Sequence, residues 1–412
     1  MPKKNTLTNG IARATLWLVI FQVIGLIIPL LTLPILARSL GVTSFGQIML
    51  AQAVVFLGVV FVDAGFNTES QRRASLAIDS LESQQVLVDN FIARFVCCLP
   101  VLLIILIVGF FVPDLPFKLV VLSLLLLLGT LIFPQWWYVA KQQGLRMGIA
   151  LMSGRLISAL MILLFVKSND DQIIACVASS SGTFIAGLLL IPSWWQKFKS
   201  QSKKINWTSW KEYLKDVRHN IFSGFFSGAS VSAPVLALGF LSGSFQTGLF
   251  TAADRLTRAS AHVLSFVEQS CMGWLAKESN QDLVRANQLR VRALAILGGI
   301  LFVGCSFVAI LSDWILHLLY GNSFSTAALI LKVLSAWLFI YGLRKAAVTF
   351  YWSAAGNLKT IAVFQWLEAV LVCLFASFGA YWSGAFGTSV GLCVSEIVLA
   401  IAAIVWINKG AR

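Results

Sequence analysis

Long apolar runs, separated by short polar segments, make up almost the whole chain. A helix of about 20 apolar residues is long enough to cross the hydrocarbon core of a membrane. The break between the last two runs rests on Ser383, Gly384 and Gly387, which interrupt an otherwise continuous apolar stretch. The pattern predicts an all-α integral membrane protein with about twelve transmembrane helices. We place them near residues 14–37, 46–66, 88–112, 119–139, 149–166, 173–192, 221–241, 249–274, 293–317, 327–350, 361–382 and 386–407.

The longest polar stretch, residues 193–220, lies near the middle of the chain and interleaves Lys and Arg with aromatic residues. This composition is typical of a segment on an anionic membrane surface, and equally of a solvated loop that only joins two halves. Either way, it predicts an N-terminal six-helix lobe over residues 1–192, a basic cytoplasmic linker over 193–220 and a C-terminal six-helix lobe over 221–412.

The two predicted lobes share a weak repeat with an offset of 200 residues. Small and apolar residues of the first two spans recur at matching places in spans seven and eight. The matches are Pro34/Pro234, Leu36/Leu236, Ala37/Ala237, Ser44/Ser244, Phe45/Phe245 and Ala53/Ala253. Two six-span units in the same orientation indicate parallel repeats about an axis along the membrane normal, with a substrate route between them.

Composition excludes a soluble protein, because 58% of the residues are hydrophobic and only 12% are charged, whereas soluble domains carry about 25% charge. The net charge of +14 reflects orientation rather than nucleic-acid binding, since Lys and Arg gather in alternate loops. The outer loops hold only Arg38, Lys118 and Lys167. Both termini are therefore predicted to be cytoplasmic.

Ionisable residues within the spans are costly and usually face a protein interior or a watery cavity. The predicted outer half holds Arg38, Arg255, Arg258 and Lys332, and the inner half holds Arg94, Arg155, Arg344 and Lys345. Such a ladder of cations around a central cationic cavity favours an anionic cargo, and arginine makes bidentate contacts to phosphate. Arg94 and Lys345 are also close enough to the interface to extend their charges into it.

The acids of the spans have two possible roles. Asp254 is spaced i, i+4 from Arg258, so the two can form a self-neutralising pair that locks helices together. Asp63, Glu368 and Glu396 can carry a proton for coupling or hydrogen-bond one helix to another. For Glu368 and Glu396 the helix-pairing role is favoured.

Catalytic constellations are missing from the sequence. It has no phosphate-cradling glycine loop, no nucleophile elbow and no metal-spaced set of His, Cys and carboxylate residues. We therefore expect no enzyme activity, no cofactor and no bound metal.

Six short stretches, spread over the length of the chain, carry a resemblance to a known family. They are Leu33-Pro34 with Arg38-Ser39-Leu40-Gly41, Asp63-Ala64-Gly65-Phe66-Asn67, Pro134-Gln135-Trp136-Trp137-Tyr138, Gly248 to Arg255, Tyr320-Gly321-Asn322-Ser323-Phe324, and Gly384-Ala385-Phe386-Gly387 with Glu396. In this order they resemble stretches of the O-antigen or polysaccharide repeat-unit flippases (Wzx), in the polysaccharide-transport branch of the multidrug/oligosaccharidyl-lipid/polysaccharide exporters. Two places depart from the family pattern: Phe250 replaces a usual tyrosine, and Val139-Ala140 replaces a common Gln-Gly pair.

The resemblance implies an undecaprenyl-diphosphate-linked oligosaccharide as cargo, moved by alternating access from the inner to the outer leaflet of a bacterial inner membrane. It also leaves room for a polysaccharide polymerase and a chain-length regulator as partners, beside membrane lipid and without nucleic acid. Two alternatives stay open. A cation-coupled drug antiporter of the same superfamily predicts excess acid in the cavity, and a membrane-embedded sugar polymerase or ligase predicts a large polar outer loop.

Overall fold

The computed structural model describes residues 4–63, 65–77, 80–111, 115–201, 207–279, 283–353 and 358–410. Within these ranges the secondary structure is helical throughout, with no strand. In chain order the elements are α1 (Lys4–Asp63), α2 (Phe66–Leu76), α3 (Ser80–Phe111), α4 (Phe117–Ile132), α5 (Gln135–Ala140), α6 (Gly144–Phe165), η1 (Asn169–Asp171), α7 (Gln172–Gln201), α8 (Trp207–Leu241), α9 (Gly243–Ser279), α10 (Leu283–Ile310), α11 (Ser312–Tyr320), η3 (Asn322–Phe324), α12 (Ala327–Val348), η4 (Thr349–Ser353) and α13 (Leu358–Gly410).

The all-helical membrane fold predicted from the sequence is confirmed. In the described ranges, nine helical segments are long and apolar enough to cross a membrane. Two of them, Ile27–Leu76 and Thr360–Ile407, have double length and are broken by non-helical residues at Gly41 and at Ser383-Gly384. Two passes for each of these, together with the polar but 37-residue α9, account for the twelve predicted spans.

The chain forms two compact units. Unit 1 comprises Met1–Leu40 and Leu50–Gly228, and unit 2 comprises Gly41–Met49 and Ala229–Arg412. The stretch predicted as a linker, 193–220, is largely helical and belongs to unit 1, apart from 202–206, which lie outside the described residues. The reason is packing: Tyr213 and Val217 of α8 are buried against Phe66 of α2 and Ala93 of α3.

Small residues let the helices of unit 1 pack with their backbones close together. A Cβ added to Gly154 of α6 would overlap the carbonyl of Gly182 on α7, and one added to Gly129 of α4 would overlap the backbone at Phe184. The hydroxyl of Ser158 donates a hydrogen bond to the carbonyl of Ala178 across the same α6–α7 contact. Such contacts are how helices associate in lipid, where apolar side chains gain little by leaving it.

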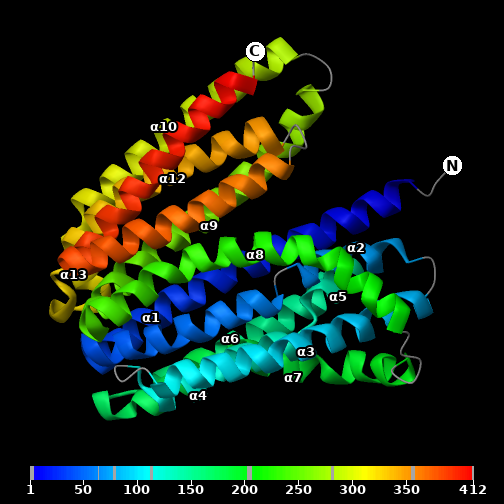
Figure 1. Cartoon of the computed structure of the whole chain (residues 1–412), viewed down its shortest axis with the longest axis horizontal. Coiled ribbons are helices and arrows are strands. Elements are labelled where there is room, and N and C mark those ends of the chain that lie inside the picture. The colour runs from blue at the N-terminus through cyan, green and yellow to red at the C-terminus, as the bar shows by residue number, and fades with distance from the viewer. Residues whose placement is uncertain are drawn as a thin grey trace. The chain divides into compact units, whose positions relative to one another are not determined.

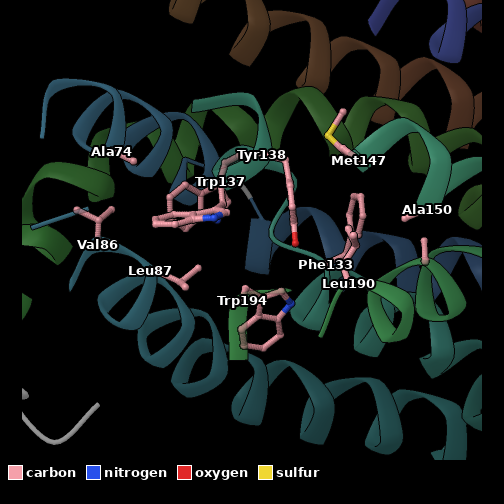
Figure 2. Close-up of a cluster of buried hydrophobic side chains, with 12 residues drawn as sticks. Ala74, Val86, Leu87, Phe133, Trp137, Tyr138, Met147, Ala150, Leu190 and Trp194 are labelled. Atoms are coloured by element: carbon pink, nitrogen blue, oxygen red, sulfur yellow. The ribbon is translucent and has the colours of Figure 1, made fainter. Parts of the chain in front are cut away.

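One end of unit 1 is filled by a buried aromatic cluster drawn from α2, α3, α5, α6 and α7. Figure 2 shows Trp137 and Tyr138 of α5 together with Trp194 of α7, beside Val86 and Leu87 of α3. The hydroxyls of Tyr138 and Ser193 hydrogen-bond across it. This cluster fixes α5 against the end of α7.

In unit 2, α12 packs against α9, α10 and α13 (Figure 1). The two halves of α13 fold back on one another after Ser383 and Gly384, where φ of Gly384 is 57° and ψ is −134°. Gly379 and Gly387 then face each other so closely that a Cβ on either would meet the other's carbonyl. The predicted break between the last two spans is confirmed.

Two further glycines of unit 2 make a reciprocal contact. A Cβ on Gly46 would overlap the carbonyl of Ser244, and a Cβ on Gly248 would overlap the carbonyl of Val42. Gly46 and Gly248 are 202 positions apart, as are Val42 and Ser244. This spacing is close to the 200-residue offset of the predicted repeat. Gly46 contacts Ser244, and the equivalent residues exchange places, so that Gly248 contacts Val42. An exchange of this kind is expected where two equivalent segments are related by a local two-fold axis. The turns preceding this contact also match, with positive φ at Gly41 and Gly243.

We expect Gly46→Ala and Gly248→Ala to destabilise the protein by similar amounts, about 1–3 kcal/mol each, because the added methyl group forces two backbones apart. Melting temperature in detergent measures the effect. The control is Gly304→Ala on α10, where a Cβ meets nothing within 4 Å and alanine favours the helix. A loss in the control equal to that at Gly46 would contradict the close-contact explanation.

Candidate functional site

The polar face of α9 carries one neutralised arginine and one that is left over. Arg258 Nε donates to Asp254 Oδ2 at 2.6 Å, and the Arg258 guanidinium lies 5.8 Å from the centre of the Trp337 ring. Arg255, the residue after Asp254, is exposed, and no hydrogen bond or ion pair is described for it within the ranges given above. The surplus positive charge predicted for this helix therefore rests on Arg255.

A buried ion cluster joins α12 to both halves of α13. Arg344 donates to Glu396 at 2.6 and 3.2 Å and to Glu368 at 2.9 Å. The side chains of Arg344 and Glu396 are almost completely buried. One guanidinium thus holds two carboxylates from helices that are adjacent in the fold, which is a helix-pairing arrangement.

Lys345, next to Arg344, points to a different neighbour. Its Nζ lies 3.0 Å from Ser265 Oγ of α9 and 5.3 Å from the centre of the Tyr341 ring. Glu268 lies one turn further along α9, buried, and its Oε1 accepts no hydrogen bond from the described part of the chain. No ion pair is described for this carboxylate in the part of the chain that the structure covers, although Lys345 and Arg344 both act on its charge from a distance.

Unit 1 shows the same division between paired and unpaired cations. Arg94 of α3 donates to Asp63 at 2.5 Å and to the Thr130 carbonyl at 2.8 Å, and Asn67 donates to the other Asp63 oxygen at 2.6 Å. Arg155 of α6 instead lies over Gly25 of α1, where its Nη1 occupies the space of a Cβ. No carboxylate partner is described for Arg155 in the residues that the structure covers.

The structure differs from the sequence prediction in how deeply some of these cations are buried. Arg38 is exposed, as is Lys332, which pairs with Asp313 at 2.7 Å. Lys332 lies in the second turn of α12, and its side chain is exposed. The position of a residue within an apolar run of the sequence therefore did not determine whether its side chain is buried. Among the eight predicted cations, ion pairs with carboxylates are described for Arg94, Arg258, Lys332 and Arg344.

Sequence inspection missed the aromatic partners of these charges. Tyr341 lies one turn before Arg344 and Lys345 and contacts both, at 5.6 and 5.3 Å from the ring centre. The i, i+3 and i, i+4 spacing was visible in the sequence and could have indicated the contacts. Trp337 belongs to a different helix from Arg258, so no local spacing could have found that pair.

A polar network attaches the first part of α8 to unit 1. The Tyr213 hydroxyl lies 2.7 Å from Ser70 Oγ, and Asn90 donates to both. Asp216 accepts from Arg73 at 2.6 Å. Burial raises the pKa of Tyr213 to about 12, so its phenol stays protonated over the physiological range.

The described residues contain no group of three or more His, Cys, Asp or Glu side chains that could hold a metal ion.

We expect Arg344→Gln to destabilise the fold by about 3–5 kcal/mol, because it leaves two carboxylates buried without their cation. Lys332→Gln is the control, since it removes an exposed ion pair worth less than about 1 kcal/mol. Abundance in the membrane and melting temperature in detergent measure both variants. Equal stability of the two would show that Arg344 does not hold α12 and α13 together.

The chain is similar in sequence to a known protein family and to a described relative. The model of a family described as "Polysaccharide biosynthesis protein" matches residues 11–272. A protein of Escherichia coli (strain K12) described as "Putative O-antigen transporter" is 24% identical over 411 residues, covering 91% of this chain and 93% of that protein.

Solved structures share the fold. An inward-facing multidrug-resistance MATE-family transporter of the MOP superfamily superposes with a TM-score of 0.75 at 16% identity, covering 93% of this chain and 94% of that one. The lipid II flippase MurJ in an inward closed conformation also gives 0.75, at 13% identity over 95% and 87% of the two chains. Since its family model covers more than half of the residues, the chain belongs to the polysaccharide biosynthesis protein family, which confirms the resemblance found in the sequence.

Proposed function

We propose that the protein is a flippase that moves an undecaprenyl-diphosphate-linked oligosaccharide from the inner to the outer leaflet of a bacterial inner membrane. The observation that carries the proposal is the pairing of charges. Arg94, Arg258 and Arg344 form ion pairs with carboxylates, whereas no ion pair is described for Arg155 in unit 1 or for Arg255 in unit 2, although Asp254 lies near enough to Arg255 to attract it electrostatically. A cation on a membrane-spanning helix without an ion-pair partner favours an anionic cargo.

The chemistry of the cargo suits these two arginines. A diphosphate offers planar pairs of oxygens, and a guanidinium donates two parallel hydrogen bonds to such a pair. The described hydrogen bond of Asp254 goes to Arg258 and not to Arg255, so the hydrogen-bond donors of Arg255 remain available for the cargo. The family relationship supports polysaccharide transport, and the Escherichia coli relative bears the name of an O-antigen transporter.

Transport by alternating access is part of the proposal. The two spanning hairpins that begin the halves each turn at a glycine with positive φ, Gly41 and Gly243, and their tips meet in the reciprocal contact of Gly46 and Gly248. Matching glycine turns and glycine contacts of this kind are compatible with two parallel repeats that rock about a fixed binding site during transport. For coupling, Asp63 and Glu396 remain candidates. Each accepts hydrogen bonds from an arginine, so a proton would have to displace that arginine.

We expect Arg155→Gln and Arg255→Gln each to lower glycan export by about tenfold or more, since a charge-assisted hydrogen bond to a buried anion is worth about 1.5–3 kcal/mol. Arg255→Lys should also lose export, because lysine cannot form the planar fork. The assay is rescue of surface glycan in a flippase-deficient bacterial strain, with membrane abundance measured alongside.

The control for this experiment is Arg292→Gln, an exposed arginine of α10, which should rescue fully. Normal export by both Arg155→Gln and Arg255→Gln at normal abundance would refute the assignment of these residues to the cargo.

Both termini are proposed to be cytoplasmic, because the loops that would then face inward hold most of the Lys and Arg residues. Reporter fusions after Lys118 and Lys167 should report the outside, and one after Arg412 the inside. An outward report at Arg412 would overturn either the orientation or the number of spans.

A further inference from the structure

One end of unit 1 gathers positive side chains that the proposed transport route does not use. Lys141 directly follows α5, Arg146 lies in the first turn of α6, and Lys197 lies near the end of α7. Lys141 Nζ lies 5.3 Å, and Lys197 Nζ 5.7 Å, from the centre of the same Trp137 ring. Arg146 interacts electrostatically with the phenol of the neighbouring Tyr138.

These charges have been brought together without a counter-ion. Because both ammonium groups are measured from one ring centre, they lie within about 11 Å of each other, a separation comparable to the Debye length of about 8 Å at physiological salt. No carboxylate is described as partner to Lys141, Arg146 or Lys197 in the part of the chain that the structure covers. An anion from outside would relieve the mutual repulsion between them.

The surroundings hold the site in place. Trp137 is buried in the aromatic cluster with Tyr138 and Trp194 (Figure 2), and a tryptophan face attracts cations through its ring quadrupole. The lysine stems can therefore rest on a fixed ring while their charges remain available. Both lysines are only partly buried, and Arg146 is exposed, so all three can be reached.

Exposed apolar residues continue from Arg146 along α6 and from Lys197 along α7. On α7, Leu189, Ser193 and Lys197 share one face, and Leu189 is 53% exposed about 12 Å further along the helix. On α6, Ile149 follows Arg146 by one turn, and Leu156 and Leu160 continue the exposed strip. A ligand for this surface has a negative head at the helix ends and apolar chains alongside the helices.

We propose that Lys141, Arg146 and Lys197 bind the phosphodiester of an anionic glycerophospholipid, with its acyl chains along the exposed faces of α6 and α7. Basic surfaces at the cytoplasmic ends of spanning helices attract anionic headgroups at about 1 kcal/mol for each Lys or Arg. A soluble phosphate would leave the apolar strips unused. The site lies apart from Arg155 and Arg255 in the sequence, and it stands independently of what the protein transports.

The test is native mass spectrometry of the purified full chain in detergent, titrated with cardiolipin, phosphatidylglycerol or phosphatidylethanolamine. We expect the two anionic lipids to bind more tightly than phosphatidylethanolamine. In Lys141→Gln/Lys197→Gln that preference should fall by about tenfold or more, since two charges are lost. The matched control is Lys118→Gln/Lys167→Gln, which removes two exposed lysines of unit 1 and should bind as the unaltered chain does.

Two further arms keep the test decisive. Lys141→Arg/Lys197→Arg should retain binding because it keeps both charges, and Arg146→Gln alone should weaken binding less than the double variant does. The exposed Arg146 variant also serves if the double variant cannot be purified. Equal lipid binding by the double variant and its control would overturn the proposal. The proposal would also be overturned if undecaprenyl phosphate displaced cardiolipin when present at a lower concentration than the cardiolipin, because the surface would then be a site for the cargo lipid.

Discussion

The packing of helices within each unit depends on one constraint, the close approach of one helix backbone to another. Helices in lipid gain little from burying apolar side chains, so contact requires residues small enough to bring the main chains together. Gly154 serves this purpose between α6 and α7, Gly379 and Gly387 within α13, and Gly46 and Gly248 at the reciprocal contact. Each fixes the position of charged side chains further along the same helices.

Charge pairing then decides what those helices can do. A carboxylate placed next to a guanidinium removes it from any role as a free cation, and the cost of burying either alone is several kcal/mol. Arg344 connects α12 to both halves of α13 through Glu368 and Glu396, which is a structural task. Arg155 and Arg255 differ from it because no ion pair is described for either, and because Arg255 is exposed.

The proposed transport route and the proposed lipid surface use cations in different ways. Within the bundle, arginine is favoured because its planar fork matches phosphate oxygens and its charge is permanent. At the helix ends near Trp137, lysine is equally suitable, since a headgroup close to water needs positive charge rather than a fixed geometry. The 31 Lys and Arg residues of the chain thus include some that are paired with acids, some that we propose for the cargo and some that we propose for lipid.

Apolar periodicity in the sequence determined the number of spans, the break at Ser383-Gly384 and the repeat, because run length and glycine act locally. It also identified which ionisable residues lie in the spans. It did not determine that residues 193–220 would pack mostly as helix into unit 1, nor that Lys332 would be exposed. The i, i+4 spacing did indicate the pair of Asp254 and Arg258, which lie on one helix. Pairing between helices was out of reach, because nothing local to α12 assigns Arg344 to Glu368 and Glu396 of α13. The tertiary structure decided these points because the partners come from separate helices, and the energy of a charge in a membrane depends on what is next to it in space.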